Sequence, residues 1–303
     1  SPMSRGLGDV YKRQVFGIPL ARFADVWVRR SLISIGLMFW SAMTAMSGFA
    51  RSFSMLAIFR VGVGIGEASA SPAAYSMLAD YYPQRLRATV IAIYSSGVYI
   101  GGGIGLFLGG FIMETWNSTF PVPVVAPLGL KGWQAAFLAV GIPGILMAVW
   151  VRTLKEPLRG VSEGIVTQQH PNPVGVLLTE SAAMIPILNL VGLARVGASI
   201  PLNLLGAAII GAIAWLLIYL TGSVVQWIAL GIGIYVVFCW VQSLKARDPV
   251  TYEMIFKSKA MVYTMLAFPT ISFVTYGVGF WTAPLLLRLH ETSATEVGMY
   301  IGL

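Results

Sequence analysis

Long apolar stretches separated by short polar segments form the main pattern along the chain. An α-helix needs about 20 apolar residues to cross the hydrocarbon core of a bilayer. Stretches of that length lie near residues 31–50, 53–79, 89–112, 134–152, 202–221, 223–243 and 260–287. Their apolar residues follow one another without the polar alternation of a membrane strand, which excludes a β-barrel. The pattern therefore predicts an all-α polytopic membrane protein.

Shorter apolar segments at the two ends of the chain do not complete a span. Residues 15–23 are typical of the last turns of a helix and residues 292–303 of the first turns of another, so we expect a chain truncated at both ends. Residues 1–14, SPMSRGLGDVYKRQ, are polar and basic and lack the apolar core of a signal peptide. We expect them to be a non-native or disordered N-terminus, with a natural soluble N-terminus as the alternative.

The middle of the chain, residues 161–201, mixes apolar and polar positions and is interrupted by four prolines. Its apolar part, residues 174–193, contains Glu180 and Pro186, and we interpret it as a helix lying at the inner membrane surface. The two spans that follow, within residues 202–243, form a helical hairpin that enters and leaves on the same side. The hairpin carries no charged residue, and we expect it to be peripheral.

Composition and charge agree with a membrane protein. Apolar residues make up 57% of the chain and charged residues 11%, whereas soluble domains carry about 25% charged residues. If the loop after Phe23 is cytoplasmic, most arginines and lysines lie on the inner side, and the outer side holds only Arg51, Lys131 and Arg288. The positive-inside rule gives this orientation. The net charge of +8 therefore reflects topology and does not indicate a nucleic-acid partner.

Few residues offer covalent or metal chemistry. Cys239 is the single cysteine and lies in an apolar stretch, so an intrachain disulfide is impossible. His170 and His290 stand alone in predicted loops, which favours solvated side chains over a metal site. No cofactor is expected. The sequence has no H-E-x-x-H, no paired-aspartate motif and no nucleophile–histidine set inside the spans, which argues against a membrane enzyme.

Two charges inside one predicted span are the most informative feature. Arg60 and Glu67 are the only ionisable residues in 53–79, and each costs about 2.5–3.5 kcal/mol at the bilayer centre. They lie seven residues apart, or about 10.5 Å along one helix face, so each is expected to pair with another helix. One interpretation is a structural ion pair. The other is a transport site, in which Glu67 takes and releases a proton and Arg60 stabilises its charged form or holds an anionic substrate group.

Glycine recurs every fourth residue in the span 89–112. The repeat consists of Gly97, Gly101, Gly105 and Gly109. Such a stripe lets another helix backbone approach closely. It predicts tight helix packing, and in a transporter the same stripe could also serve as a sliding surface.

The loop GIPLARFADVWVRRS, residues 17–31, resembles the loop between helices two and three of the major facilitator superfamily, G-x-L-A-D-R-x-G-R-R. Asp25, Arg29 and Arg30 match that pattern, whereas Ala21, Phe23, Val26 and Val28 depart from it. Two spans later, Arg60-x-x-x-Gly64-x-Gly66 resembles the helix-four motif of the same superfamily, whose arginine is linked to proton coupling.

A longer set of matches resembles the Spinster branch of this superfamily, which includes lysolipid and sphingosine-phosphate exporters. It comprises residues 60–69, RVGVGIGEAS, then Pro72, residues 80–83, DYYP, and residues 87–88. Residues 19–22, 133–137, 281–284 and 296–298 fit the same branch. The hairpin 202–243 departs from the typical Spinster pattern, although peptide transporters of the superfamily carry a similar insertion.

The resemblance implies a partial major facilitator fold, from the end of helix two to the start of helix eight, with an extra two-helix hairpin in the central loop. The expected division is an N-terminal bundle at 15–160, a central segment at 161–250 and the start of a C-terminal bundle at 251–303. The helix-one acidic site of the family has no counterpart in this sequence.

The implied function is secondary active transport of an amphipathic or lipid-like solute, coupled to protons, in a bacterial inner membrane. Tyr75, Tyr94 and Tyr99 would contribute to the lining of the transport path. A cytoplasmic gate would close through ion pairs among Arg22, Asp25, Arg29, Arg30, Asp80 and Arg87. The alternatives are a superfamily transporter of sugar acids, other organic anions or drugs, and a membrane scaffold that transports nothing.

Overall fold

A computed structural model describes residues 17–164, 170–195, 197, 199–289 and 293–302, and the predicted non-native N-terminus, 1–14, lies outside these. The described residues are almost entirely helical, with no strand among them. The chain divides into two compact units: a hairpin unit, Ser1–Phe23 with Asn172–Gly279, and a bundle unit, Ala24–Pro171 with Phe280–Leu303. The three-part division expected from the sequence stays a prediction.

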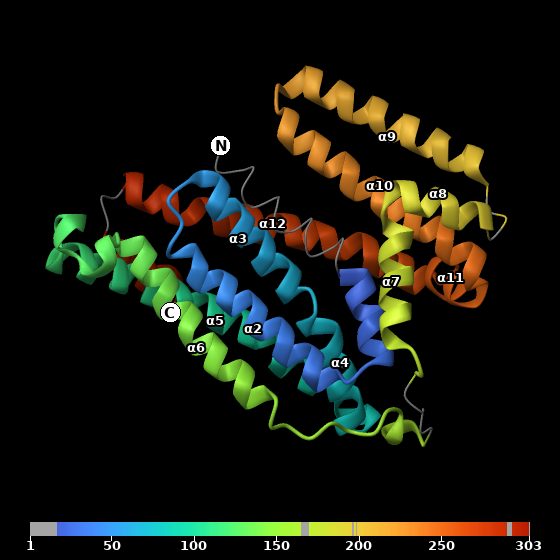
Figure 1. Cartoon of the computed structure of the whole chain (residues 1–303), viewed down its shortest axis with the longest axis horizontal. Helices are drawn as coiled ribbons and strands as arrows, with labels where there is room; N and C mark the ends of the chain where they lie inside the picture. Colours follow the sequence, from blue (N-terminus) through green and yellow to red (C-terminus); the bar gives the residue numbers. More distant parts are fainter. Residues whose placement is uncertain (1–16, 165–169, 196, 198, 290–292, 303) are drawn as a thin grey trace. The chain divides into compact units, whose positions relative to one another are not determined.

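The helices of the bundle unit are α2 (Arg29–Ser47), α3 (Phe53–Glu67), α4 (Ala70–Tyr81), α5 (Gln84–Thr119), α6 (Gly132–Val151) and α13 (Ala294–Gly302). The hairpin unit holds α7 (Pro173–Met184), α8 (Pro186–Arg195), α9 (Ile200–Thr221), α10 (Val224–Arg247) and α11 (Pro249–Phe256). Helix α12 (Lys259–Leu289) runs across the division, and residues 17–26 are also helical. Figure 1 shows these elements in sequence colours.

Six helical segments of the described chain are long and apolar enough to cross a membrane. They are Phe53–Tyr81, Gln84–Thr119, Gly132–Val151, Ile200–Thr221, Val224–Arg247 and Lys259–Leu289. Each contains or closely overlaps a predicted span, so the prediction of a multi-pass all-α membrane protein is confirmed. The predicted span 31–50 corresponds to α2, a 19-residue helix outside this set. Two arginines and several serines make α2 less apolar than the others.

The single helix expected over 174–193 is wrong. The structure has two helices there, α7 and α8, bent by 106° at their junction. Pro186 begins α8, because proline lacks the N–H that would continue α7 and its ring clashes with the carbonyl four residues earlier. The pair fits either a broken span or a re-entrant loop.

Close backbone approach organises the core of the bundle unit, where α2 packs against α3, α4 and α6 (Figure 1). A Cβ added at Gly36 would overlap the hydroxyl of Ser69, and one at Gly66 would lie 2.9 Å from the Gly36 carbonyl oxygen. Likewise, a Cβ at Gly141 would lie 2.5 Å from the Ala45 nitrogen. These glycines let the helix backbones touch, as membrane interfaces between small residues do.

The predicted glycine stripe on α5 behaves differently. A Cβ at Gly97, Gly101, Gly105 or Gly109 would meet no atom within 4 Å in the described part of the chain. The neighbour of α5 in this region is α13, whose Gly298 lies against Leu106 and Phe107 on another face. The stripe therefore has no packing partner among the described residues, and its packing role stays a prediction.

A buried polar cluster holds the hairpin of α9 and α10 together. Asn203 is fully buried, and its amide nitrogen donates to Gln242 Oε1 at 2.8 Å. Its amide oxygen accepts from the Tyr235 hydroxyl at 2.7 Å. Gly206 of α9 lies directly against the ring of Phe238 of α10. Side-chain hydrogen bonds of this kind are a common way to fix two helices in register inside a membrane.

Candidate functional site

Arg60 and Glu67, the predicted coupling pair, lie on one helix beside a tightened turn. Both are partly exposed, both belong to α3, and both interact with other residues. Glu67 is the last residue of α3, and Ala68 and Ser69, which keep helical φ/ψ, join it to α4 within the span Phe53–Tyr81. The Ser69 N–H donates to the Gly66 carbonyl three residues earlier, and the Ser69 hydroxyl donates to the same carbonyl at 2.7 Å. A short tightened turn within a helix often marks a functional hinge.

Arg29 is the centre of an ion-pair cluster at the end of the bundle unit that is predicted to face the cytoplasm. Only 1% of Arg29 is exposed. Its Nε donates to Glu156 Oε1 at 3.0 Å, and its Nη1 donates to Asp80 Oδ2 at 2.5 Å. Nη1 also donates to the Ser76 carbonyl at 3.0 Å, and Nη2 to the Pro157 carbonyl at 2.9 Å. One guanidinium therefore joins α2, α4 and the segment that follows α6.

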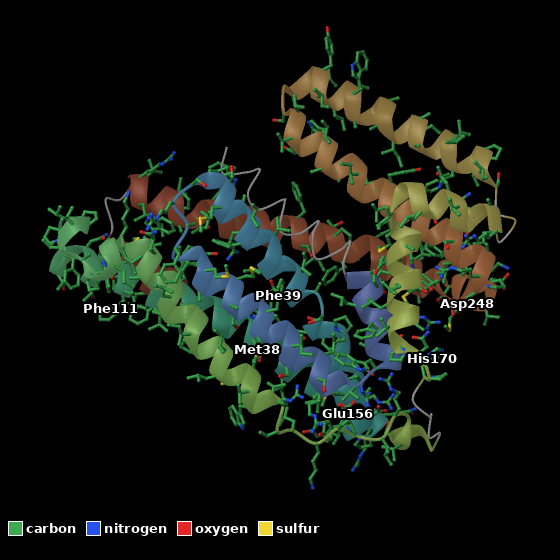
Figure 2. All side chains as sticks on the ribbon, in the orientation of Figure 1. Met38, Phe39, Phe111, Glu156, His170 and Asp248 are labelled. Carbon is green, nitrogen blue, oxygen red and sulfur yellow. The ribbon has the colours of Figure 1, made fainter. Side chains whose placement is uncertain are left out.

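Glu156 also caps the first turn of α2. Its carboxylate accepts from the main-chain N–H of Arg29 at 3.2 Å and of Arg30 at 2.8 Å. Val28, at the N-cap position, offers no side-chain cap. Two arginines at a helix N-terminus oppose the helix dipole, and a carboxylate there compensates. Figure 2 labels Glu156 beside this end of α2.

The same segment, residues 154–162, brings in the other predicted gate residues. Arg30 donates to the Leu154 carbonyl at 2.7 Å. Asp80 uses its second oxygen, Oδ1, to accept from the Gly160 N–H at 3.0 Å. Arg87 donates to the Ser162 hydroxyl at 2.8 Å. The structure thus connects Arg29, Arg30, Asp80 and Arg87 through a segment that the sequence did not assign to the cluster.

Arg159 is a further member that the sequence did not reveal. Its guanidinium donates to the carbonyls of Ala24 at 2.6 Å and Trp27 at 2.7 Å, and also to that of Asp25. Burial, and then the nearby charge of Arg29, lower the pKa of Arg159. Asp25 thus meets the cluster through its main-chain carbonyl, and the charge of its exposed carboxylate partly offsets the lowered pKa of Arg159. The available signal for these members was the Lys-Glu-Pro-Leu-Arg run, residues 155–159, directly after a span.

Arg22, the remaining predicted gate residue, belongs to the hairpin unit. There its charge acts on Asp248, which caps α11. The Thr251 hydroxyl donates to Asp248 Oδ2 at 2.7 Å and the Thr251 N–H to Oδ1 at 3.0 Å. These two hydrogen bonds lower the pKa of Asp248, and Arg22 lowers it further. Within the hairpin unit, Arg22 therefore acts on Asp248.

The tyrosines expected to line a substrate path divide into a pair and a single ring. Tyr75 on α4 and Tyr94 on α5 pack edge to face, with ring centroids 5.5 Å apart. Tyr99 is 73% exposed. No group of three or more His, Cys, Asp or Glu that could hold a metal occurs among the described residues. His290 lies outside them.

Comparison with known proteins identifies a family that covers most of the chain and individual relatives that match half of it. The sequence model of the Major Facilitator Superfamily matches residues 14–303. The protein spinster of Drosophila melanogaster is 27% identical over 150 residues, which is 50% of this chain and 22% of that protein. The benzoate transport protein of Acinetobacter baylyi is 25% identical over 152 residues, 50% of this chain and 29% of that protein. The chain thus matches under a third of each relative's length.

A solved structure shares the fold. The inward-facing, unoccupied crystal structure of a bacterial homolog of the human lysosomal transporter Spinster has a TM-score of 0.52 and 23% sequence identity to this chain. The match covers 100% of this chain and 83% of the other. The expected Spinster resemblance is therefore confirmed at the level of sequence relatives and of fold.

Proposed function

Because this chain belongs to the Major Facilitator Superfamily, a family of membrane transporters, we propose that it moves an amphipathic, lipid-like solute across a membrane in exchange for, or together with, protons. The observation that carries the proposal is the pair Arg60 and Glu67 beside the tightened turn of one candidate span. We place the protein in a bacterial inner membrane.

The proton role rests on the position of Glu67. A carboxyl group is the simplest side chain in this span that can bind and release a proton, and Arg60 is the only other charged residue of 53–79. The tightened turn at residues 68–69 lies directly beside Glu67. Such a turn within a helix often marks a functional hinge. A proton on Glu67 would remove one charge from this region, which changes the balance between two conformations.

The substrate class rests on the apolar surroundings and on the relatives. Tyr75, in the same span as Arg60 and Glu67, and Tyr94 of α5 together supply an aromatic surface. Such a surface, with one cation for an anionic headgroup, suits a lysolipid. The Spinster relatives support this choice. The benzoate transport protein supports the second candidate, an organic anion such as a sugar acid or an aromatic acid, which Arg60 would also attract.

In the proposed transport cycle, the Arg29 cluster would hold one half of the transporter together. All of its described hydrogen bonds lie within the bundle unit, so it fixes the ends of α2 and α4 and the segment after α6 as one rigid body. A rigid half is what rocking-type alternating access requires. Arg22 and Asp25 remain the proposed gate residues that would open and close the inner side.

The experiment is solute accumulation by proteoliposomes under an imposed pH gradient. Glu67→Gln is expected to insert normally but to lose gradient-driven accumulation. Arg60→Lys is expected to be severely impaired, because lysine lacks the planar fork that can hold two partners. Glu253→Gln, at an exposed position on α11, is the matched control and should transport normally. Uptake of lysophosphatidylcholine against benzoate separates the two substrate classes.

A further inference from the structure

A pocket of about 470 Å³ opens at the end of the bundle unit opposite to the Arg29 cluster. It lies between the α2–α3 loop, which contributes Phe49 and Arg51, and the start of α6, which contributes Lys131 and Trp133. Lys131 and Trp133 also line an adjoining pocket of about 260 Å³. We call the larger space the outer basic pocket.

Two unpaired cations converge on the outer basic pocket. Arg51 and Lys131 are exposed, and neither forms an ion pair with any residue that the structure describes. The nearby carboxylate of α5, Glu114, accepts hydrogen bonds from Thr295 instead. The positive-inside rule disfavours basic residues on this side of the membrane. The charge pattern places three basic residues on this side, Arg51, Lys131 and Arg288. Two of them, Arg51 and Lys131, line the same pocket.

The rim of the pocket is unusually apolar. Residues 121–130, PVPVVAPLGL, contain no charged or hydrogen-bonding side chain. Val124 is 89% exposed, Leu128 81% and Val125 66%. Two short 3-10 turns, Pro123–Val125 and Pro127–Gly129, and three prolines hold this loop, which Figure 1 shows in green between α5 and α6. Such side chains gain about 25 cal/mol for each Å² that leaves water.

The ends of the helices bear on what covers this rim. The pocket lies where α2, α3, α5 and α6 end. If these helices span the hydrocarbon core, their ends meet the lipid headgroups. Trp133 and Phe49 line it, and aromatic residues are enriched at this interface. Apolar side chains beside cations match the two chemistries of a phospholipid, acyl chains and a phosphate.

We infer that the outer basic pocket binds the headgroup of an anionic phospholipid through Arg51 and Lys131, with the loop 121–130 inserted among the acyl chains. The charge complementarity and the apolar rim act together. A free phosphate would use the cations but not the loop. The site is separate from Arg60 and Glu67, and the inference does not depend on the proposed transport activity.

The test measures lipid binding to the purified chain in detergent by native mass spectrometry. The probes are phosphatidylglycerol and phosphatidylcholine with identical acyl chains, with inorganic phosphate as competitor. Each cation near an anionic surface contributes roughly a 5-fold change in affinity, so Arg51→Gln with Lys131→Gln should weaken phosphatidylglycerol binding about 25-fold. Both side chains are exposed, so the double variant should fold.

Two controls make the result specific. Arg85→Gln with Arg152→Gln removes two exposed charges at the opposite end and should change binding by less than about 2-fold. Val124→Ser with Leu128→Ser should weaken lipid binding through the loop alone. The inference is wrong if phosphatidylglycerol and phosphatidylcholine bind equally well. It is also wrong if the control pair loses as much phosphatidylglycerol affinity as Arg51→Gln with Lys131→Gln. A third contrary result is that millimolar phosphate displaces the lipid while the loop variant binds it normally.

Discussion

Removing Glu156 should destabilise the bundle unit more than any surface position can. Glu156→Ala deletes the carboxylate that binds the guanidinium of Arg29 and caps the first turn of α2. Arg29 would keep Asp80 and the main-chain carbonyls of Ser76 and Pro157. It would nevertheless lose one of its two carboxylates while remaining buried.

The magnitude follows from these contacts. Loss of a helix N-cap costs about 1 kcal/mol. Loss of a hydrogen bond to a charged group costs about 1.5–3 kcal/mol, and the lower part of that range applies because 22% of the Glu156 side chain is exposed. The sum is about 2.5–3 kcal/mol. For a chain of 303 residues that corresponds to roughly 4–5 °C in Tm.

The assay is thermal unfolding of the purified chain in detergent, followed by tryptophan fluorescence. Glu156→Gln keeps one acceptor oxygen and should lose about half as much stability. Glu253→Gln removes an exposed carboxylate paired with Lys257 and should cost at most about 0.5 kcal/mol. If Glu156→Ala unfolds within 1 °C of the unmodified chain, the description of Glu156 as the cap and counter-ion of α2 is wrong.

Three other predictions use the same chain. Gly36→Ala should lower the free energy of unfolding by about 1–3 kcal/mol in a thermal unfolding assay, because the added Cβ overlaps Ser69. Gly101→Ala adds a Cβ in open space and should be neutral or stabilising. Equal effects of the two substitutions would contradict the assigned packing. Asn203→Ala should destabilise the α9–α10 hairpin by about 1–2 kcal/mol, measured by denaturation in SDS; no change would show that its hydrogen bonds are dispensable. Thr251→Val should raise the pKa of Asp248 in a carboxyl NMR titration, because it removes the hydroxyl donor; an unchanged pKa would refute that cause. The stability that Asp248 contributes is present above its unfolded pKa of about 3.9 and is lost as pH falls through the lower folded value.

The sequence predicted the helical spans well because hydropathy and length decide them. The same reasoning failed where one residue overrides the average, as at Pro186, which splits the segment 174–193 into two helices. It also did not predict the tightened turn after Glu67, because no proline or charge marks residues 68–69.

The candidate site was predictable only in part. Motif spacing identified Arg29, Asp80 and Arg87, but it could not find Glu156, whose partners lie over 120 residues away along the chain. Glycine spacing selected the α5 stripe, while the structure places the close backbone contact at Gly36 and Gly66. A glycine repeat shows where a helix can be approached, and only tertiary packing decides which helix approaches it.

The most direct test of the central claim is the pH dependence of solute accumulation in proteoliposomes that carry the unmodified protein or Glu67→Gln. The proposed mechanism predicts that the unmodified protein accumulates lysophosphatidylcholine only when a proton gradient is imposed, and that Glu67→Gln shows no gradient-driven accumulation at any pH. Accumulation by Glu67→Gln with the same magnitude and pH dependence as the unmodified protein would contradict it.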